Sequence, residues 1–149
     1  MSTRAHRREI RLPVVADRVF DALVRPSAIR AWWSASRAIV IPETGGMWAA
    51  TWGESEDEPD YVVGARIAAC RRPHLLALDR YRYFARREGP LPFEADLSTR
   101  FEIESEEGAS RLIVTQEGFP TDPVADDHYA GCAVGWDRTL EALAHYLSA

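Results

Sequence analysis

The change of hydrophobic period along the chain limits its fold more than any other feature. Between Arg37 and Phe119, apolar residues follow the alternating period of strands, as in Met47–Trp52. After Asp122–Pro123, a capping residue followed by a proline suited to a first helical position, apolar residues recur every three or four positions as far as Leu147. Strands followed by one long amphipathic helix predict an α+β fold, in which an antiparallel sheet wraps against that helix.

The segment before these strands predicts one strand and two short helices. Arg8–Val15 alternates polar and apolar residues, and Pro13 within it indicates an edge strand or a strand end. Asp17–Val24 places its apolar residues on one face of a helix. Pro26 cannot continue that helix but suits the start of another, Ser27–Trp33.

Together with the first strand, the strands between Arg37 and Phe119 predict a sheet of six or seven strands. A loop is predicted over Arg86–Phe93 from its glycine and prolines, and a hairpin turn around Gly108. The predicted strands are Ala38–Ile41, Met47–Trp52, Tyr61–Cys70, Leu75–Phe84, Leu97–Glu104 and Arg111–Glu117.

Length and charge exclude several classes of protein. A chain of 149 residues predicts one domain over residues 1–149. The net charge of −5, with dispersed arginines, argues against nucleic acid as a partner. No stretch approaches the roughly 20 apolar residues that span a bilayer, so membrane insertion is not expected. The arginine-rich start lacks the pattern of a secretory signal, and we expect a cytoplasmic protein.

Motifs for metal, cofactor or nucleophilic chemistry are not found, so no catalytic residue, metal ligand or cofactor is predicted. Cys70 and Cys132 form neither a disulfide framework nor a metal-ligand spacing. Asp126–Asp127–His128 are adjacent on a helix and cannot all face one ion. His128 and Cys132 share a helix face, which we interpret as a surface histidine above a buried small residue.

Aromatic residues are the most informative side chains in the sequence. Trp48 and Trp52, two of five tryptophans, share a strand face with only Ala50 between them. Trp136 lies on the apolar face of the last helix, beside Cys132 and two glycines. Large rings beside small residues can interlock and form part of the hydrophobic core, or they can leave a cavity lined by ring faces. Composition by itself favours a packed core over a cavity.

Three segments in this order carry a resemblance to a known superfamily: VFDALVRPSAIRAWW, GGMWAATWG and GCAVGWDRTLEALAHYL. From Arg8 to Leu147 the chain resembles the START-like, or helix-grip, superfamily, and within it the family named for the activator of the heat-shock protein 90 ATPase. The resemblance implies a sheet that grips the C-terminal helix, with an elongated cavity between them and two short helices at one end. The family has no universal catalytic residue, so none is assigned.

The resemblance also implies residues of the cavity wall, and strand alternation adds others. Trp32 and Trp33 match it from the second short helix, and Trp136 and Leu140 from the last helix. Alternation adds three strand residues. The predicted ligand-contacting residues are Trp32, Trp33, Trp48, Tyr81, Phe101, Tyr129, Cys132, Trp136 and Leu140. Selectivity is expected from polar tips such as Tyr81 and Tyr129, or from arginines at the rim.

Three hypotheses about function follow. The first is a non-catalytic module that encloses a small hydrophobic or aromatic molecule, lipids included. The second is an enzyme of the polyketide cyclase or aromatase kind, with His128, Tyr129 and Asp137 as candidates for proton transfer. The third is a chaperone-related or stress-response interaction protein that uses the acidic turn Glu54–Asp60. The exposed edge strand leaves monomer and homodimer both open.

Overall fold

The elements follow the predicted order. The computed structural model describes residues 2–149 and begins with strand β1 (Thr3–Leu12), helix α1 (Ala16–Val24) and helix α2 (Pro26–Trp32). Six strands follow: β2 (Arg37–Val40), β3 (Met47–Trp52), β4 (Tyr61–Arg71), β5 (Leu75–Ala85), β6 (Ser98–Glu106) and β7 (Ala109–Pro120). The short 3-10 helix η1 (Pro123–Ala125) leads into the long helix α3 (Asp126–Leu147).

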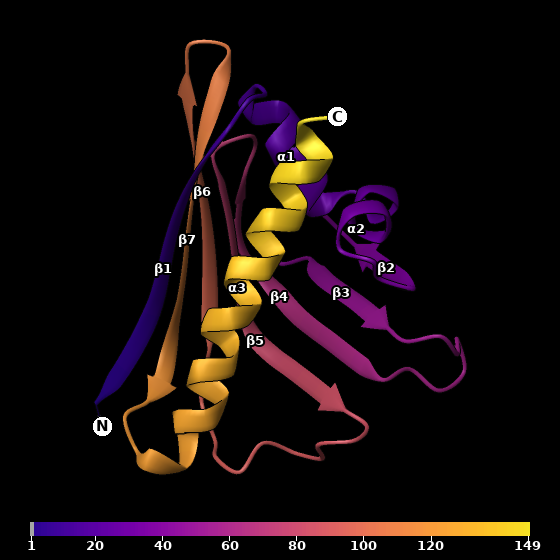
Figure 1. Cartoon of the computed structure of the whole chain (residues 1–149), viewed down its shortest axis with the longest axis vertical. Coiled ribbons are helices and arrows are strands. Elements are labelled where there is room, and N and C mark those ends of the chain that lie inside the picture. The colour runs from indigo at the N-terminus through magenta and orange to yellow at the C-terminus, as the bar shows by residue number, and fades with distance from the viewer. Residues whose placement is uncertain (1) are drawn as a thin grey trace.

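All strands belong to one antiparallel sheet. Its order is β1-β7-β6-β5-β4-β3-β2, so the first strand of the chain pairs with the last. Helix α3 runs across one face of this sheet, with α1 and α2 beside its C-terminal end (Figure 1). The predicted α+β, helix-grip architecture is confirmed, and the number of strands is seven.

Two predicted boundaries need correction. Strand β1 extends over Thr3–Leu12 and therefore ends before Pro13, which has no N–H group to continue the pairing. It is an edge strand, as predicted. At the other end of the chain, Pro123 opens a 3-10 turn instead of the long helix. The Asp122 carboxylate accepts a hydrogen bond of 3.0 Å from the amide of Val124 and so caps that turn.

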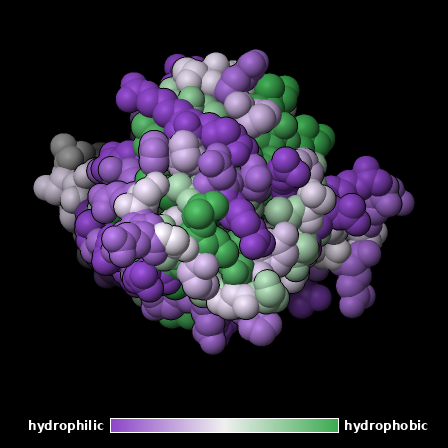
Figure 2. Space-filling model, turned by 90° about the horizontal axis from the view of Figure 1, so that it is seen from above, coloured by the Kyte–Doolittle hydropathy of each residue, from purple (hydrophilic) through white to green (hydrophobic). Residues whose placement is uncertain are grey.

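The core is concentrated at one end of α3. Helix α1 buries Val19, Phe20 and Leu23 against the sheet, and α3 adds Leu143 and Leu147 from its C-terminal half. Polar side chains cover most of this end of the molecule from outside (Figure 2). No residue in the N-terminal half of α3 is fully buried. That half of the helix lies over a part of the sheet that the core does not fill.

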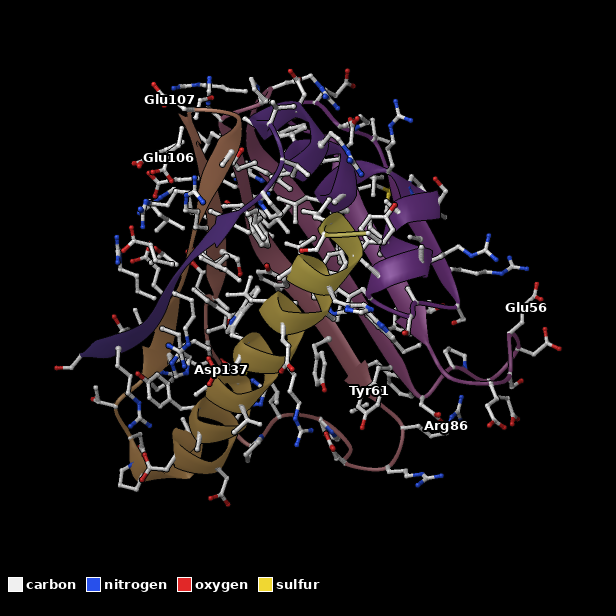
Figure 3. The ribbon with its side chains drawn as sticks, turned by 45° about the horizontal axis from the view of Figure 1, so that its top comes forward. Glu56, Tyr61, Arg86, Glu106, Glu107 and Asp137 are labelled. Carbon is white, nitrogen blue, oxygen red and sulfur yellow. The ribbon has the colours of Figure 1, made fainter. Side chains whose placement is uncertain are left out.

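One flank of α3 is fastened to β1. Arg8 Nε donates a hydrogen bond of 2.7 Å to the Asp137 carboxylate, which points from α3 toward β1 (Figure 3). His6 Nε2 donates to the carbonyl oxygen of Tyr129 at 2.8 Å, and the Tyr129 hydroxyl donates to the carbonyl oxygen of Ala5 at 2.8 Å. These contacts hold the N-terminal half of α3 to the edge strand, so any opening lies on its other flank.

A bulge in β5 sets which of its residues face α3. Arg80 and Tyr81 lie opposite the single residue Ala65 of β4, and Arg80 has a φ of 51°. Successive residues of a regular strand point to opposite faces. Because of the extra residue, Leu78 and Tyr81 face the same side although they are three positions apart.

Candidate functional site

A pocket lies between the N-terminal half of α3 and the strands β3, β4 and β5. We call it the central pocket; the tip of α2 and the connection over residues 86–97 complete its wall. It has an inner chamber of about 220 Å³ and an outer part of about 950 Å³. The two parts share Trp33, Trp52, Tyr83, His128 and Trp136. The two parts therefore adjoin each other, and we treat them together as the central pocket.

The inner chamber has a predominantly aromatic and aliphatic wall. Its deepest residues come from four elements and one connection, so no single segment of sequence forms it. The residues that line the inner chamber and not the outer part are Leu23, Trp48, Leu78, Tyr81, Leu97 and Phe101.

The tryptophans of β3 face the chamber with their polar groups already engaged. Trp48 Nε1 donates a hydrogen bond of 2.9 Å to the carbonyl oxygen of Leu23, and Trp52 Nε1 donates one of 2.9 Å to the carbonyl oxygen of Trp33. Both bonds run from the sheet to the helical segment. They orient the indole rings so that their faces and carbon edges remain for a ligand.

Two polar tips on the opposite side of the pocket, those of Trp136 and Tyr81, are engaged as well. Trp136 Nε1 donates a hydrogen bond of 2.8 Å to Oε1 of Gln116. The Tyr81 hydroxyl donates one of 2.6 Å to Oγ1 of Thr99, and burial raises the pKa of Tyr81. We expected the Tyr81 hydroxyl to contact a ligand. In the structure this hydroxyl is already hydrogen-bonded to Thr99 within the wall.

His128 and Cys132 face the pocket from successive turns of α3. The Cys132 thiol lies 3.5 Å from His128 Nε2, at a distance where it can donate to the imidazole. Burial lowers the pKa of His128, against an opposing effect of Glu88, and burial raises the pKa of Cys132 to about 11. At neutral pH the pair is a neutral imidazole and a protonated thiol, in contrast to the ion pair of a nucleophilic cysteine. His128 is half-buried and lines the pocket, which corrects its interpretation as a surface residue.

The rim of the central pocket carries negative charge. Glu88 from the β5–β6 connection and Asp127 from the first turn of α3 both line its outer part. Within residues 2–149, neither carboxylate has a cationic partner within 4.0 Å. None of the 18 arginines lines this pocket, so the expected selectivity by rim arginines is not supported.

Six of the nine predicted ligand-contacting residues lie together in the wall of the central pocket. They come from the end of α2, three strands and α3, and they surround the inner chamber. These residues are Trp33, Trp48, Tyr81, Phe101, Cys132 and Trp136.

Trp32, Tyr129 and Leu140 lie elsewhere. Trp32 stacks on the far side of Trp33, at 4.8 Å between ring centroids, and donates its Nε1 hydrogen to the carbonyl oxygen of Ala22. Tyr129 faces β1, and Leu140 is 6% exposed within the core below the pocket. These three side chains therefore do not line the central pocket.

Several lining residues escaped the sequence analysis. Tyr83 could have been found, because it alternates with Tyr81 on the same strand. The residues of the β5–β6 connection carry no periodic signal and could not. The lining residues absent from the predicted ligand-contacting set are Leu23, Trp52, Tyr61, Val63, Leu78, Tyr83, Glu88, Gly89, Pro90, Leu91, Pro92, Leu97, Gln116, Val124, Asp127, His128, Gly131, Gly135 and Thr139.

Of the three proton-transfer candidates, only His128 lines the pocket. Asp137 is bound to Arg8 on the opposite flank of α3, and the Tyr129 hydroxyl is bound to β1. Residues 2–149 contain no group of three or more histidine, cysteine or acidic side chains that could hold a metal ion. The same part of the chain has no helix long and apolar enough to cross a membrane.

Comparison with known proteins adds a family and a fold. Residues 13–148 match the family described as Activator of Hsp90 ATPase homolog 1-like protein. The crystal structure of protein MLL2253 from Mesorhizobium loti superposes with a TM-score of 0.75 at 19% identity, covering 97% of each chain. CalU16 from Micromonospora echinospora gives 0.69 at 17% identity, covering 97% of this chain and 74% of its own.

A third similar structure is DynU16, a protein of the dynemicin biosynthetic locus, with a TM-score of 0.71 at 16% identity. The match covers 97% of this chain and 47% of DynU16. No curated protein matches the sequence significantly. At these identities the structures establish a shared START-like fold.

Proposed function

We propose, from the premise that this chain belongs to the family of Activator of Hsp90 ATPase homolog 1-like proteins, that it binds a small apolar or aromatic molecule in the central pocket. The observation that carries the proposal is the state of the inner wall. Four of its aromatic side chains, Trp48, Trp52, Tyr81 and Trp136, donate their polar hydrogens to protein acceptors, so they present ring faces to the chamber. A ligand without polar groups can enter without breaking any of these hydrogen bonds.

The energetics of such a wall favour apolar ligands. Burial of apolar surface stabilises a complex by roughly 25 cal/mol per Å². A polar ligand in the inner chamber would lose its hydration and find no free donor among Trp48, Trp52, Tyr81 and Trp136. The chamber volume of about 220 Å³ suits a body of two or three fused or linked rings, with the rest of a ligand in the outer part.

Gly135 offers a sharp test of where binding occurs. It lines the outer part of the pocket from α3, and a Cβ added there meets no atom within 4 Å. In Gly135→Leu the new side chain should occupy the pocket and abolish binding of the neutral fluorescent probe N-phenyl-1-naphthylamine. In Gly135→Ala, binding should persist, and stability should rise by about 1 kcal/mol because alanine favours the helix.

Ala130→Leu is the matched control, because Ala130 is exposed on α3 outside the pocket. It should bind the probe as the unchanged protein does. Equal binding by Gly135→Leu, or no binding by the unchanged protein, would contradict the proposal. Native mass spectrometry of the freshly purified protein can detect a natural ligand that co-purifies with it. The difference between the native and the denatured mass gives the mass of that ligand and indicates its chemical class.

One observation favours a second function, an enzyme of the polyketide cyclase or aromatase kind. His128 presents a neutral imidazole to the pocket, and a neutral imidazole can accept a proton from a bound substrate. Aromatic polyketide precursors incubated with the protein would be converted, and His128→Gln would abolish the conversion while leaving probe binding intact. Conversion at the same rate by that variant would contradict this role of His128.

A further inference from the structure

We propose that the ligand of the central pocket carries a protonated amine at the end that lies in the pocket mouth. This inference rests on the proposed function and adds the chemical class of the ligand. The two observations that carry it are the sign of the charges at the mouth and the aromatic faces beside them.

Carboxylates line the mouth without cationic partners. Glu88 and Asp127 approach it from different elements, the β5–β6 connection and the first turn of α3. Arg86 and Arg87 precede Glu88 but do not line the pocket. The Arg86 side chain donates to the carbonyl oxygen of Pro59. The charges nearest to a ligand in the mouth are therefore negative.

The acidic segment between β3 and β4 adds to this field. Glu54–Asp60 connects Trp52 to Tyr61, and both of these aromatic residues line the outer part of the pocket. Arg37 pairs with Glu56, but the segment as a whole keeps a negative excess. A cation approaching this side of the molecule is attracted, whereas an anion is repelled.

The N-terminus of α3 does not reverse this sign. A helix N-terminus attracts anions through its partial positive charge. Here Asp126 and Asp127 occupy the first turn of α3. Asp126 is paired with Arg4, so Asp127 is the carboxylate that offsets the positive helix end on the pocket side. A ligand carboxylate or phosphate at the mouth would meet Asp127 and Glu88, and no arginine lines the pocket there.

Aromatic rings at the mouth suit a cation as well. Trp33, Trp52, Tyr61, Tyr83 and Trp136 line the outer part, and the face of an aromatic ring attracts a positive charge. Tyr61 lies at the edge of the mouth, at the start of β4 (Figure 3). A ligand with an apolar ring body in the inner chamber places an amine among these rings and the two carboxylates.

Three naphthalene probes of one shape and different charge test the inference: 2-(aminomethyl)naphthalene, 2-methylnaphthalene and 2-naphthylacetate. At pH 7 and low salt, quenching of tryptophan fluorescence should give tightest binding for the amine and weakest for the carboxylate. We expect about a tenfold advantage of the amine over the neutral probe, since an exposed carboxylate attracts a nearby cation only modestly and two carboxylates act together. Salt should reduce that advantage and leave the neutral probe unaffected.

The double variant Glu88→Gln/Asp127→Asn should remove the advantage of the amine without weakening the neutral probe. Glu107→Gln is the matched control, because Glu107 is exposed at the end of the molecule far from Tyr61 (Figure 3). Equal binding of the three probes, tighter binding of the carboxylate, or an advantage that survives the double variant would overturn this inference and leave the proposed function standing. Failure of all three probes to bind would overturn both.

Discussion

The Tyr81 hydroxyl on β5 donates a hydrogen bond of 2.6 Å to Oγ1 of Thr99 on β6, at the inner end of the central pocket. Thr99 is only 2% exposed, so this bond satisfies a polar group that water does not reach. The bond holds the Tyr81 ring against the wall. Tyr81 is therefore part of the scaffold of the pocket, and its hydroxyl is not free to bind a ligand.

Tyr81→Phe should therefore weaken the protein without weakening the binding of an apolar probe. The substitution leaves the buried Thr99 hydroxyl without its partner, which costs about 1–3 kcal/mol. Urea unfolding measures this loss, and titration with N-phenyl-1-naphthylamine should give an affinity within about threefold of the unchanged protein. Tyr83→Phe is the control. Because Tyr83 is 41% exposed, removal of its hydroxyl should change the free energy of unfolding little. A large loss of probe affinity in Tyr81→Phe would show that the hydroxyl contacts the ligand.

The stability of the protein should fall on acidification because of His128. Burial lowers the pKa of His128 in the folded protein, while the unfolded chain has the ordinary value of about 6.5. Below pH 6.5 the unfolded chain takes up a proton that the folded protein resists, so the free energy of unfolding decreases from pH 7 toward pH 5. His128→Gln should reduce this decrease in urea titrations. An identical pH dependence in the variant would contradict the prediction, and an NMR titration of the His128 ring measures its pKa directly.

The Cys132 thiol should react slowly with alkylating agents. Burial raises its pKa to about 11, so little thiolate exists at pH 8. We expect iodoacetamide to modify it at least about tenfold more slowly than a free thiol, and bound N-phenyl-1-naphthylamine should slow the reaction further. Cys70 is the internal control, because it lies outside the pocket with its thiol against the carbonyl oxygen of Pro42. Faster reaction at Cys132 in the presence of the probe would place the ligand elsewhere.

Predicted wall residues line the central pocket where a residue's direction follows from its own segment. Trp48 lies on a regular strand, where alternation was enough to place it. Trp136 lies on the apolar face of a regular helix, and the family resemblance assigned that face to the cavity. Trp32 and Trp33 show the limit of this reasoning. They are adjacent at the end of a short helix, and packing against α1 turns one into the core and the other into the pocket.

Tyr81 shows that tertiary pairing can change a direction. Alternation with Tyr83 groups Tyr81 on one strand face, but alternation continued from Leu76 and Leu78 would turn that face away from α3. The bulge at Arg80 brings Tyr81 to the same side as Leu78 and into the pocket. The bulge depends on how β5 pairs with β4, and no residue pattern within β5 predicts it. Similarly, Glu88 and Asp127 meet at one rim only because the β5–β6 connection and the start of α3 lie at the same end of the sheet.

The sequence by itself determined the order of elements, the antiparallel sheet and the long covering helix, because local hydrophobic period governs which face of each segment can be buried. The tertiary structure decided which half of that helix packs and which half leaves a pocket. Leu140, Leu143 and Leu147 meet α1, α2 and the sheet, while Cys132 and Trp136 stand over a part of the sheet that nothing else fills. Such a space depends on distances between elements, and those distances are set when the whole chain packs.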